Sequence, residues 1–407
     1  MPLLVAGSLG LAPGSAAGLL LAAELARPRI GVFDVERYAE FLTGHDYALY
    51  LGVWPVGVAV ALMGVPLGPR GRVLGGLGSL LVLAGAIVVA LALGRAPGSF
   101  AVGWTSYAPG TPPPSFHDVR QELGIGRALG LAGIVCAAAP LVARGGPLRM
   151  AGVASVCIAP FPLAAFLAAA AGSTWEASRH VAFYAAALPF LGAVGETVGR
   201  VRLGRLYALS VAAFVPVAAA VWIEHAVRAP LGGGGWEDAA LALPLVGALA
   251  ALLVTLAVAR PSLPLAFGAC ALVALAASGG VGASLAASDP FEHLTDTQVV
   301  NAHLHLALAG FVLFALLGLA HARLPGLDER LGALELALLL AGTATLTIAE
   351  WLAGHRRMPR RVADYAPVFA GENLAAAVGG ALAAAAILVF LLDWARGSRF
   401  PNPRVRS

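Results

Sequence analysis

Asp296-Thr297-Gln298-Val299-Val300-Asn301-Ala302-His303-Leu304-His305 opens an apolar run that continues without a charged residue to position 320. A run of this length is sufficient to cross a bilayer as a helix. Polar side chains at membrane depth are costly and usually have a function, so the two histidines are notable. Residues two apart on a helix are separated by roughly 200° around its axis. This stretch therefore predicts a membrane-spanning helix whose two histidines point to opposite sides.

The rest of the chain has the same apolar character. Its 407 residues are 59% hydrophobic and 12% charged, whereas a soluble domain carries about 25% charged residues. Stretches of some twenty uncharged residues recur along it, which predicts an all-α polytopic membrane bundle of about twelve helices forming a single integral-membrane domain over 1–407. The spans are expected at 3–25, 45–66, 73–94, 126–143, 150–171, 180–199, 204–223, 239–259, 262–286, 298–320, 331–352 and 374–394.

Arginine distribution predicts the orientation. An even number of spans puts both termini on one side, and the arginine-rich tail (396–406) shares that side with several short arginine-bearing loops. The positive-inside rule makes this side cytoplasmic. The first apolar run, 3–25, has no positive segment before it and is expected to be a retained span. Nothing indicates nucleic-acid binding, because no basic stripe is interleaved with aromatic residues.

Histidine is the main candidate ligand. A single histidine within a span is explained equally well by an interhelical hydrogen bond. Several together, in a chain that contains arginine but no lysine, favour ligation of a metal or haem. Of the nine histidines, five fall in or at the ends of predicted spans: His45, His180, His225, His303 and His305.

Five motifs follow one another in a fixed order: GWTSYAP at 103–109, HVAFY at 180–184, GGVG at 279–282, DTQVVNAHLH at 296–305 and MPRRVADY at 358–365. In order and spacing they resemble motifs of subunit I of the haem-copper oxygen reductases. The resemblance covers about residues 43–375. It implies the membrane-bundle fold of that subunit, in a prokaryotic inner membrane with both termini cytoplasmic.

The resemblance also implies two haem sites. His45, at the start of the second span, and His305 would bind a low-spin haem, and His303 would bind a high-spin haem. Arg360 and Arg361 would meet the haem propionates, near Trp104. Guanidinium groups suit carboxylates through paired hydrogen bonds, which would account for an arginine cluster on the outer face; a solvated loop is the alternative.

A distal metal site is implied as well, with one departure from the family pattern. His180 and His225 would bind the metal, which is copper in the family, and Tyr184 would be the linked tyrosine. Tyr184 is one helical turn after His180, so the two share a face, although packing alone would also explain that pair. Glu224 replaces the first of two adjacent histidines. It would be a metal ligand that favours non-haem iron over copper, or a proton carrier.

The implied function is that of the catalytic subunit of a respiratory terminal oxidase. Electrons from cytochrome c or quinol, delivered through a partner subunit, would pass through the low-spin haem to the high-spin haem and distal metal, where O2 is reduced to water. Tyr184 favours O2 as the substrate. Glu224 favours NO, as in nitric oxide reductases of the same superfamily. A transporter with twelve spans is the alternative of another class.

Some features have no counterpart in the family pattern. The family's lysine-based proton channel has no equivalent, because the chain contains no lysine. Three further histidines match no family position and are expected at the surface or at interfaces: His117, His321 and His355.

Overall fold

The computed structural model describes residues 15–27, 45, 68–95, 114–140, 146–160, 163–164, 179–197, 201–228, 236–286, 294, 297–360 and 365–399. Side chains are described for these residues except at 93–95, 114–121, 123, 148, 179–187, 224–228, 236–239, 241–242, 283, 286 and 398–399. Within the described ranges the chain is helical, and its β-structure is one isolated antiparallel bridge between Thr297 and Pro359.

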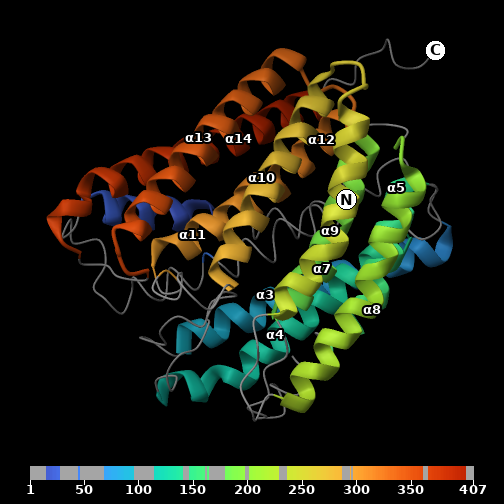
Figure 1. Cartoon of the computed structure of the whole chain (residues 1–407), viewed down its shortest axis with the longest axis horizontal. Coiled ribbons are helices and arrows are strands. Elements are labelled where there is room, and N and C mark those ends of the chain that lie inside the picture. The colour runs from blue at the N-terminus through green and yellow to red at the C-terminus, as the bar shows by residue number, and fades with distance from the viewer. Residues whose placement is uncertain are drawn as a thin grey trace.

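Figure 1 shows how the helices are arranged. A short apolar helix spans Ser15–Ala26. The later elements are α3 (Pro69–Arg95), α4 (Pro114–Ala138), α5 (Gly146–Ile158), α7 (Arg179–Thr197), α8 (Gly204–Arg228), α9 (Trp236–Leu256), α10 (Leu263–Ala286), α11 (Gln298–His305), η3 (Leu306–Val312), α12 (Leu313–Arg323), α13 (Glu329–His355), η4 (Pro367–Phe369) and α14 (Ala370–Arg399).

Most of the described helices lie within a few residues of a predicted span. The span predicted at 45–66 lies outside the described residues except for His45, and so do positions 3–14 of the first span and 165–171 of the fifth. Helix α4 begins at Pro114, well before the predicted start at 126. The charged residues of 114–125 indicated a loop, yet a proline is well suited to the first turn of a helix, and the chain is already helical there.

The helix surfaces require an apolar solvent. Six described helices are long and apolar enough to cross a membrane. Large side chains point outward from them, with Leu80 67%, Leu209 71% and Val273 65% exposed. Contiguous apolar surface of this kind would aggregate in water but suits lipid. The chain is therefore a multi-pass membrane protein.

One helical rod, formed by α11, η3 and α12, runs from Gln298 to Arg323 and is the most enclosed of the six spans. Within its most apolar stretch, 67% of the residues are buried inside the protein. It packs against α10 on one side and α13 on the other, and Figure 1 shows α13 and α14 running together beyond it. The histidines of the opening motif are therefore interior residues between helices.

Glycines allow α13 and α14 to approach closely. A Cβ on Gly342 would lie 2.5 Å from the backbone nitrogen of Ala383 and 2.7 Å from the carbonyl oxygen of Gly379. A Cβ on Gly379 would in turn lie 2.7 Å from the carbonyl oxygen of Gly342. Small residues at such crossings are typical of membrane helix pairs, whose association depends on close packing rather than on the hydrophobic effect.

Gly379→Ala should therefore destabilise the protein by about 1–3 kcal/mol, because the new methyl group meets backbone atoms that cannot rotate away. Gly380→Ala is the matched control, since a Cβ there meets nothing within 4 Å. Thermal unfolding of the two purified variants in one detergent measures the difference. Equal unfolding temperatures would contradict the close contact.

Candidate functional site

The start of α11 is fixed by its cap and by a second segment of the chain. Thr297 is the N-cap, and its hydroxyl accepts a hydrogen bond from the backbone N–H of Val299 at 3.3 Å and donates one to the carbonyl of Leu294 at 2.8 Å. The backbone N–H of Gln298 donates to the carbonyl of Met358 at 3.0 Å. Two motifs that are far apart in the sequence, at 296–305 and 358–365, therefore meet at one point.

His303 faces α10. Its Nδ1 lies 2.9 Å from the carbonyl oxygen of Ser278, and the Ser278 hydroxyl donates to the carbonyl of His303 at 3.1 Å. A carbonyl oxygen can only accept, so Nδ1 of His303 carries a proton. A Cβ on Gly282 would lie 2.8 Å from Cε1 of His303, so the glycine of the GGVG motif provides the space that this ring occupies.

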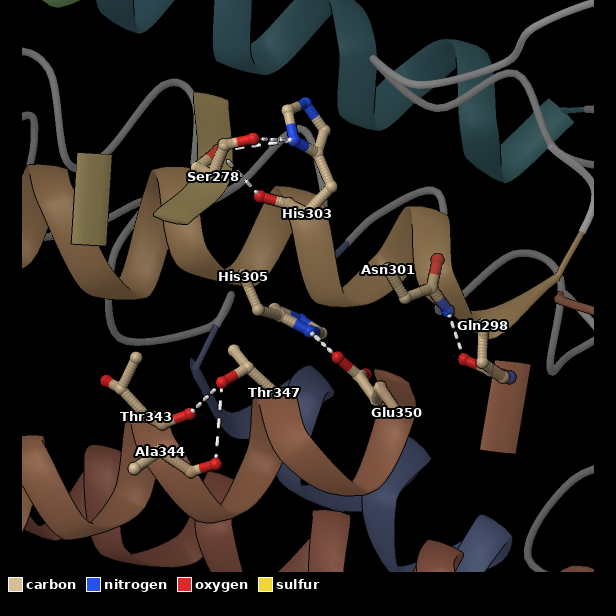
Figure 2. A network of polar contacts seen from close by, with 9 residues as sticks. All are labelled: Ser278, Gln298, Asn301, His303, His305, Thr343, Ala344, Thr347 and Glu350. Carbon is tan, nitrogen blue, oxygen red and sulfur yellow. Dashed lines mark hydrogen bonds and ion pairs between the residues drawn. The ribbon is translucent and has the colours of Figure 1, made fainter. Parts of the chain in front are cut away.

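His305 faces α13, on the opposite side of the rod (Figure 2). Its Nδ1 lies 2.7 Å from Oε2 of Glu350, and the side chain of Glu350 is 10% exposed. A carboxylate oxygen accepts, so the Nδ1 proton of His305 points at Glu350. The prediction that the two histidines point to opposite sides is confirmed, because His303 is bonded to α10 and His305 to α13.

A π-helical segment, η3 (Leu306–Val312), follows His305 directly. Such wide turns are rare and occur most often at functional sites. A Cβ on Gly310, within this segment, would lie 2.7 Å from Cβ of Ala274 in α10. The irregular turn therefore lies tightly against α10 immediately after the two histidines.

His45 packs against the first described helix. A Cβ on Gly18 would lie 2.5 Å from Cε1 of the His45 ring, so the absence of a side chain at residue 18 admits the imidazole. Tyr365 donates a hydrogen bond from its hydroxyl to the carbonyl of Leu25, which ties the same helix to the segment before α14. Burial raises the pKa of Tyr365 above its usual value, so its hydroxyl remains a donor.

Arg360 is buried, at 5% exposure, directly after the residues that pair with α11. The turn into this segment places Arg357 at a φ of 66°, in the left-handed region that side chains other than glycine rarely adopt. Met358 is fully buried behind it. The alternative of a solvated loop is wrong for Arg360. Arg361 and Trp104 lie outside the described residues.

The proposed distal ligands are described only by their backbone. Residues 180 and 184 fall in α7, and residues 224 and 225 fall in α8, which extends to Arg228, beyond the predicted end at 223. Their four side chains lie outside the described part. Among the residues whose placement is described, no three His, Cys, Asp or Glu residues form a metal-binding group. The distal site therefore remains a prediction.

The expectation of a surface or interfacial position is wrong for His321. Its side chain is 4% exposed, and its Nε2 lies 2.8 Å from Oε2 of Glu335, whose side chain is fully buried. The ring stacks on Phe267 with centroids 5.5 Å apart. His355, by contrast, is exposed as expected. Glu335, which lies within the predicted span 331–352, was the sequence feature that could have indicated a buried partner for His321, because acidic residues inside membranes need partners.

The described residues fit haem ligation on structural grounds. Two imidazoles have their Nδ1 protons fixed, and the glycines Gly18 and Gly282 leave space against the rings of His45 and His303. A haem ligated by histidine is usually held through one ring nitrogen while the other nitrogen donates a hydrogen bond to the protein. Together, the fold and these rings define a helical membrane protein with hydrogen-bonded histidines between its helices.

Comparisons with known proteins agree with this class. The sequence matches the family described as cytochrome C and quinol oxidase polypeptide I over residues 1–382. A probable cytochrome c oxidase subunit 1-beta of Nocardia farcinica is 24% identical over 466 positions, which cover 95% of this chain and 76% of that protein. A putative cytochrome c oxidase subunit 1-beta of Streptomyces coelicolor is 35% identical over 133 positions, covering 31% of this chain and 23% of that protein.

A solved structure shares the fold. The cryo-EM structure of a haem-copper terminal oxidase dimer aligns with a TM-score of 0.71 at 16% sequence identity, covering 98% of this chain and 83% of that chain. The chain belongs to the cytochrome c and quinol oxidase polypeptide I family, since the family match extends over residues 1–382. The resemblance inferred from the motifs and the predicted all-α membrane fold are both confirmed.

Proposed function

We propose that the chain is the catalytic subunit of a membrane-bound terminal oxidase that reduces O2 to water with electrons from a partner subunit. The observation that carries the proposal is the pair of α11 histidines, whose Nδ1 protons are fixed by Ser278 and Glu350 on opposite sides of the helix. Family membership supports it and favours an oxidoreductase over the transporter alternative. Both termini are proposed to be cytoplasmic, which puts Arg360 on the outer side.

The proposal gives each candidate residue a task. His45 and His305 would hold a low-spin haem, His303 would hold a high-spin haem, and Arg360 would meet the propionates, with Arg361 and Trp104 expected beside it. When bound, the haems and the distal metal supply the electron-transfer and gas-binding chemistry. The protein fixes the ring orientation through Nδ1 and excludes water with the apolar helices around α11.

A second candidate substrate is NO. Its support is Glu224, which stands directly before His225 in α8, where the family pattern has a histidine. A carboxylate is a harder donor than imidazole and suits iron better than copper. Tyr184, one turn after His180 in α7, supports O2, because a four-electron reduction uses a local donor of one electron and one proton.

His45→Ala should remove the low-spin haem band while the high-spin haem stays bound, because His303 is on a different helix from His45. His355→Ala is the matched control, since the side chain of His355 is exposed and matches no family motif. Reduced-minus-oxidised spectra of the purified variants measure both haems. Retention of both haem bands in His45→Ala would contradict the assignment.

Arg360→Gln should lower the reduction potential of at least one haem. A buried positive charge favours the reduced form, and its removal takes that preference away. Arg357→Gln provides the comparison, because Arg357 is exposed and only three residues away. Spectroelectrochemical titration gives the potentials. Equal potentials in both variants and the unaltered protein would show that Arg360 does not meet a propionate.

Glu224→Ala should lose the distal metal and keep both haems if Glu224 is a ligand, and Glu224→His should raise the copper content by changing the donor from oxygen to nitrogen. If Glu224 carries protons instead, Glu224→Gln should slow turnover with the metal content unchanged. Elemental analysis of the three variants separates these roles. Full distal metal occupancy in Glu224→Ala would exclude ligation.

A further inference from the structure

Glu350 is an acidic residue inside a membrane-spanning helix. It lies in α13 (Glu329–His355), which is long and apolar enough to cross the membrane, and it is 8% exposed. Ionisable side chains in such positions are rare and usually functional. Its carboxylate oxygen Oε2 is 2.7 Å from Nδ1 of His305.

The backbone holds this pair in place. Gly354, one turn after Glu350, lies against the backbone nitrogen of Val299 so closely that a Cβ there would collide with it. Helices α13 and α11 are therefore in backbone contact beside the pair. The neighbouring Thr347 hydroxyl donates to the carbonyl of Thr343 at 2.8 Å (Figure 2), so this hydroxyl is bonded within its own helix rather than to Glu350.

The two α11 histidines have chemically different partners. His303 donates from Nδ1 to a neutral carbonyl oxygen of Ser278 at 2.9 Å, whereas His305 donates from Nδ1 to a carboxylate at 2.7 Å. A carboxylate is the stronger acceptor and gives an imidazole more anionic character, which makes Nε2 a more basic ligand. A more basic axial ligand stabilises ferric over ferrous iron.

We propose that Glu350 is a positioning residue for the low-spin haem: its carboxylate fixes the tautomer and orientation of His305 and lowers the reduction potential of the iron that His305 binds. The inference rests on the proposed role of His305 as a haem ligand. The neutral carbonyl partner of His303 does not lower the reduction potential in this way. The iron that His303 binds therefore has the higher reduction potential of the two and is the favoured site for an electron.

The same helix contains a matched control. Glu335 is fully buried and lies 2.8 Å from Nε2 of His321, so it is also a buried carboxylate paired with a histidine. It precedes Glu350 by fifteen residues, which is about 22 Å along a helix. A change at Glu335 therefore removes the same group from α13 without touching a proposed haem ligand.

The test is a spectroelectrochemical titration of the purified full-length protein with its haems bound. Glu350→Gln keeps the size of the side chain and an acceptor oxygen but removes the charge. We expect the ratio of ferric to ferrous low-spin haem at a fixed potential to fall about tenfold. For a one-electron couple this is a rise of about 59 mV in midpoint potential. Glu350→Asp should stay near the original value, and Glu335→Gln should leave the low-spin potential unchanged.

The outcomes separate this inference from the proposed function. A low-spin haem that remains bound with the same potential in Glu350→Gln as in Glu335→Gln would overturn the role of Glu350 and leave the haem assignment intact. Retention of an unaltered low-spin band in His305→Ala would instead overturn the assignment of His305 as ligand. An equal rise of potential in Glu350→Gln and Glu335→Gln would also contradict the inference, because it would show an effect of buried charge in general.

Discussion

Polar side chains inside a membrane bundle must find their partners on neighbouring helices, because no water is present to hydrate them. Helix α11 carries two histidines two residues apart, so it needs partners on opposite sides. Helix α10 supplies the carbonyl of Ser278, and α13 supplies the carboxylate of Glu350. This requirement places α11 between α10 and α13, and the rest of the site is arranged around it.

The close approach of these helices depends on glycines, which have no side chain, and on a hydrogen-bonded clamp at the start of α11. Gly282 leaves room for the ring of His303, and Gly354 admits the backbone of α11 beside α13. The clamp is the hydrogen bond from the backbone N–H of Gln298 to the carbonyl of Met358, which also brings the segment of the buried Arg360 to the start of α11. His305, its partner Glu350 and the buried Arg360 thus come from three segments that pack against one another along α11.

Much of the helical fold could be predicted from the sequence, because it depends on local patterns of charge and residue spacing. Charge-free runs predicted the helices, and the separation of His303 from His305 predicted opposite directions. The partners could not be predicted, because Glu350 is 45 residues from His305 and the contact depends on how α13 packs. The same limit hid the burial of His321 against Glu335. The π-helical turn after His305 has no recognisable composition, and the charged start of α4 was mistaken for a loop.

The central claim is that histidines of this membrane bundle ligate two different haems beside a third metal. A reduced-minus-oxidised spectrum of the purified protein, combined with elemental analysis of the same sample, tests it most directly. The account predicts two haems per chain, one low-spin and one high-spin, together with one further copper or non-haem iron. A protein that folds in the membrane and purifies without haem absorption would contradict it.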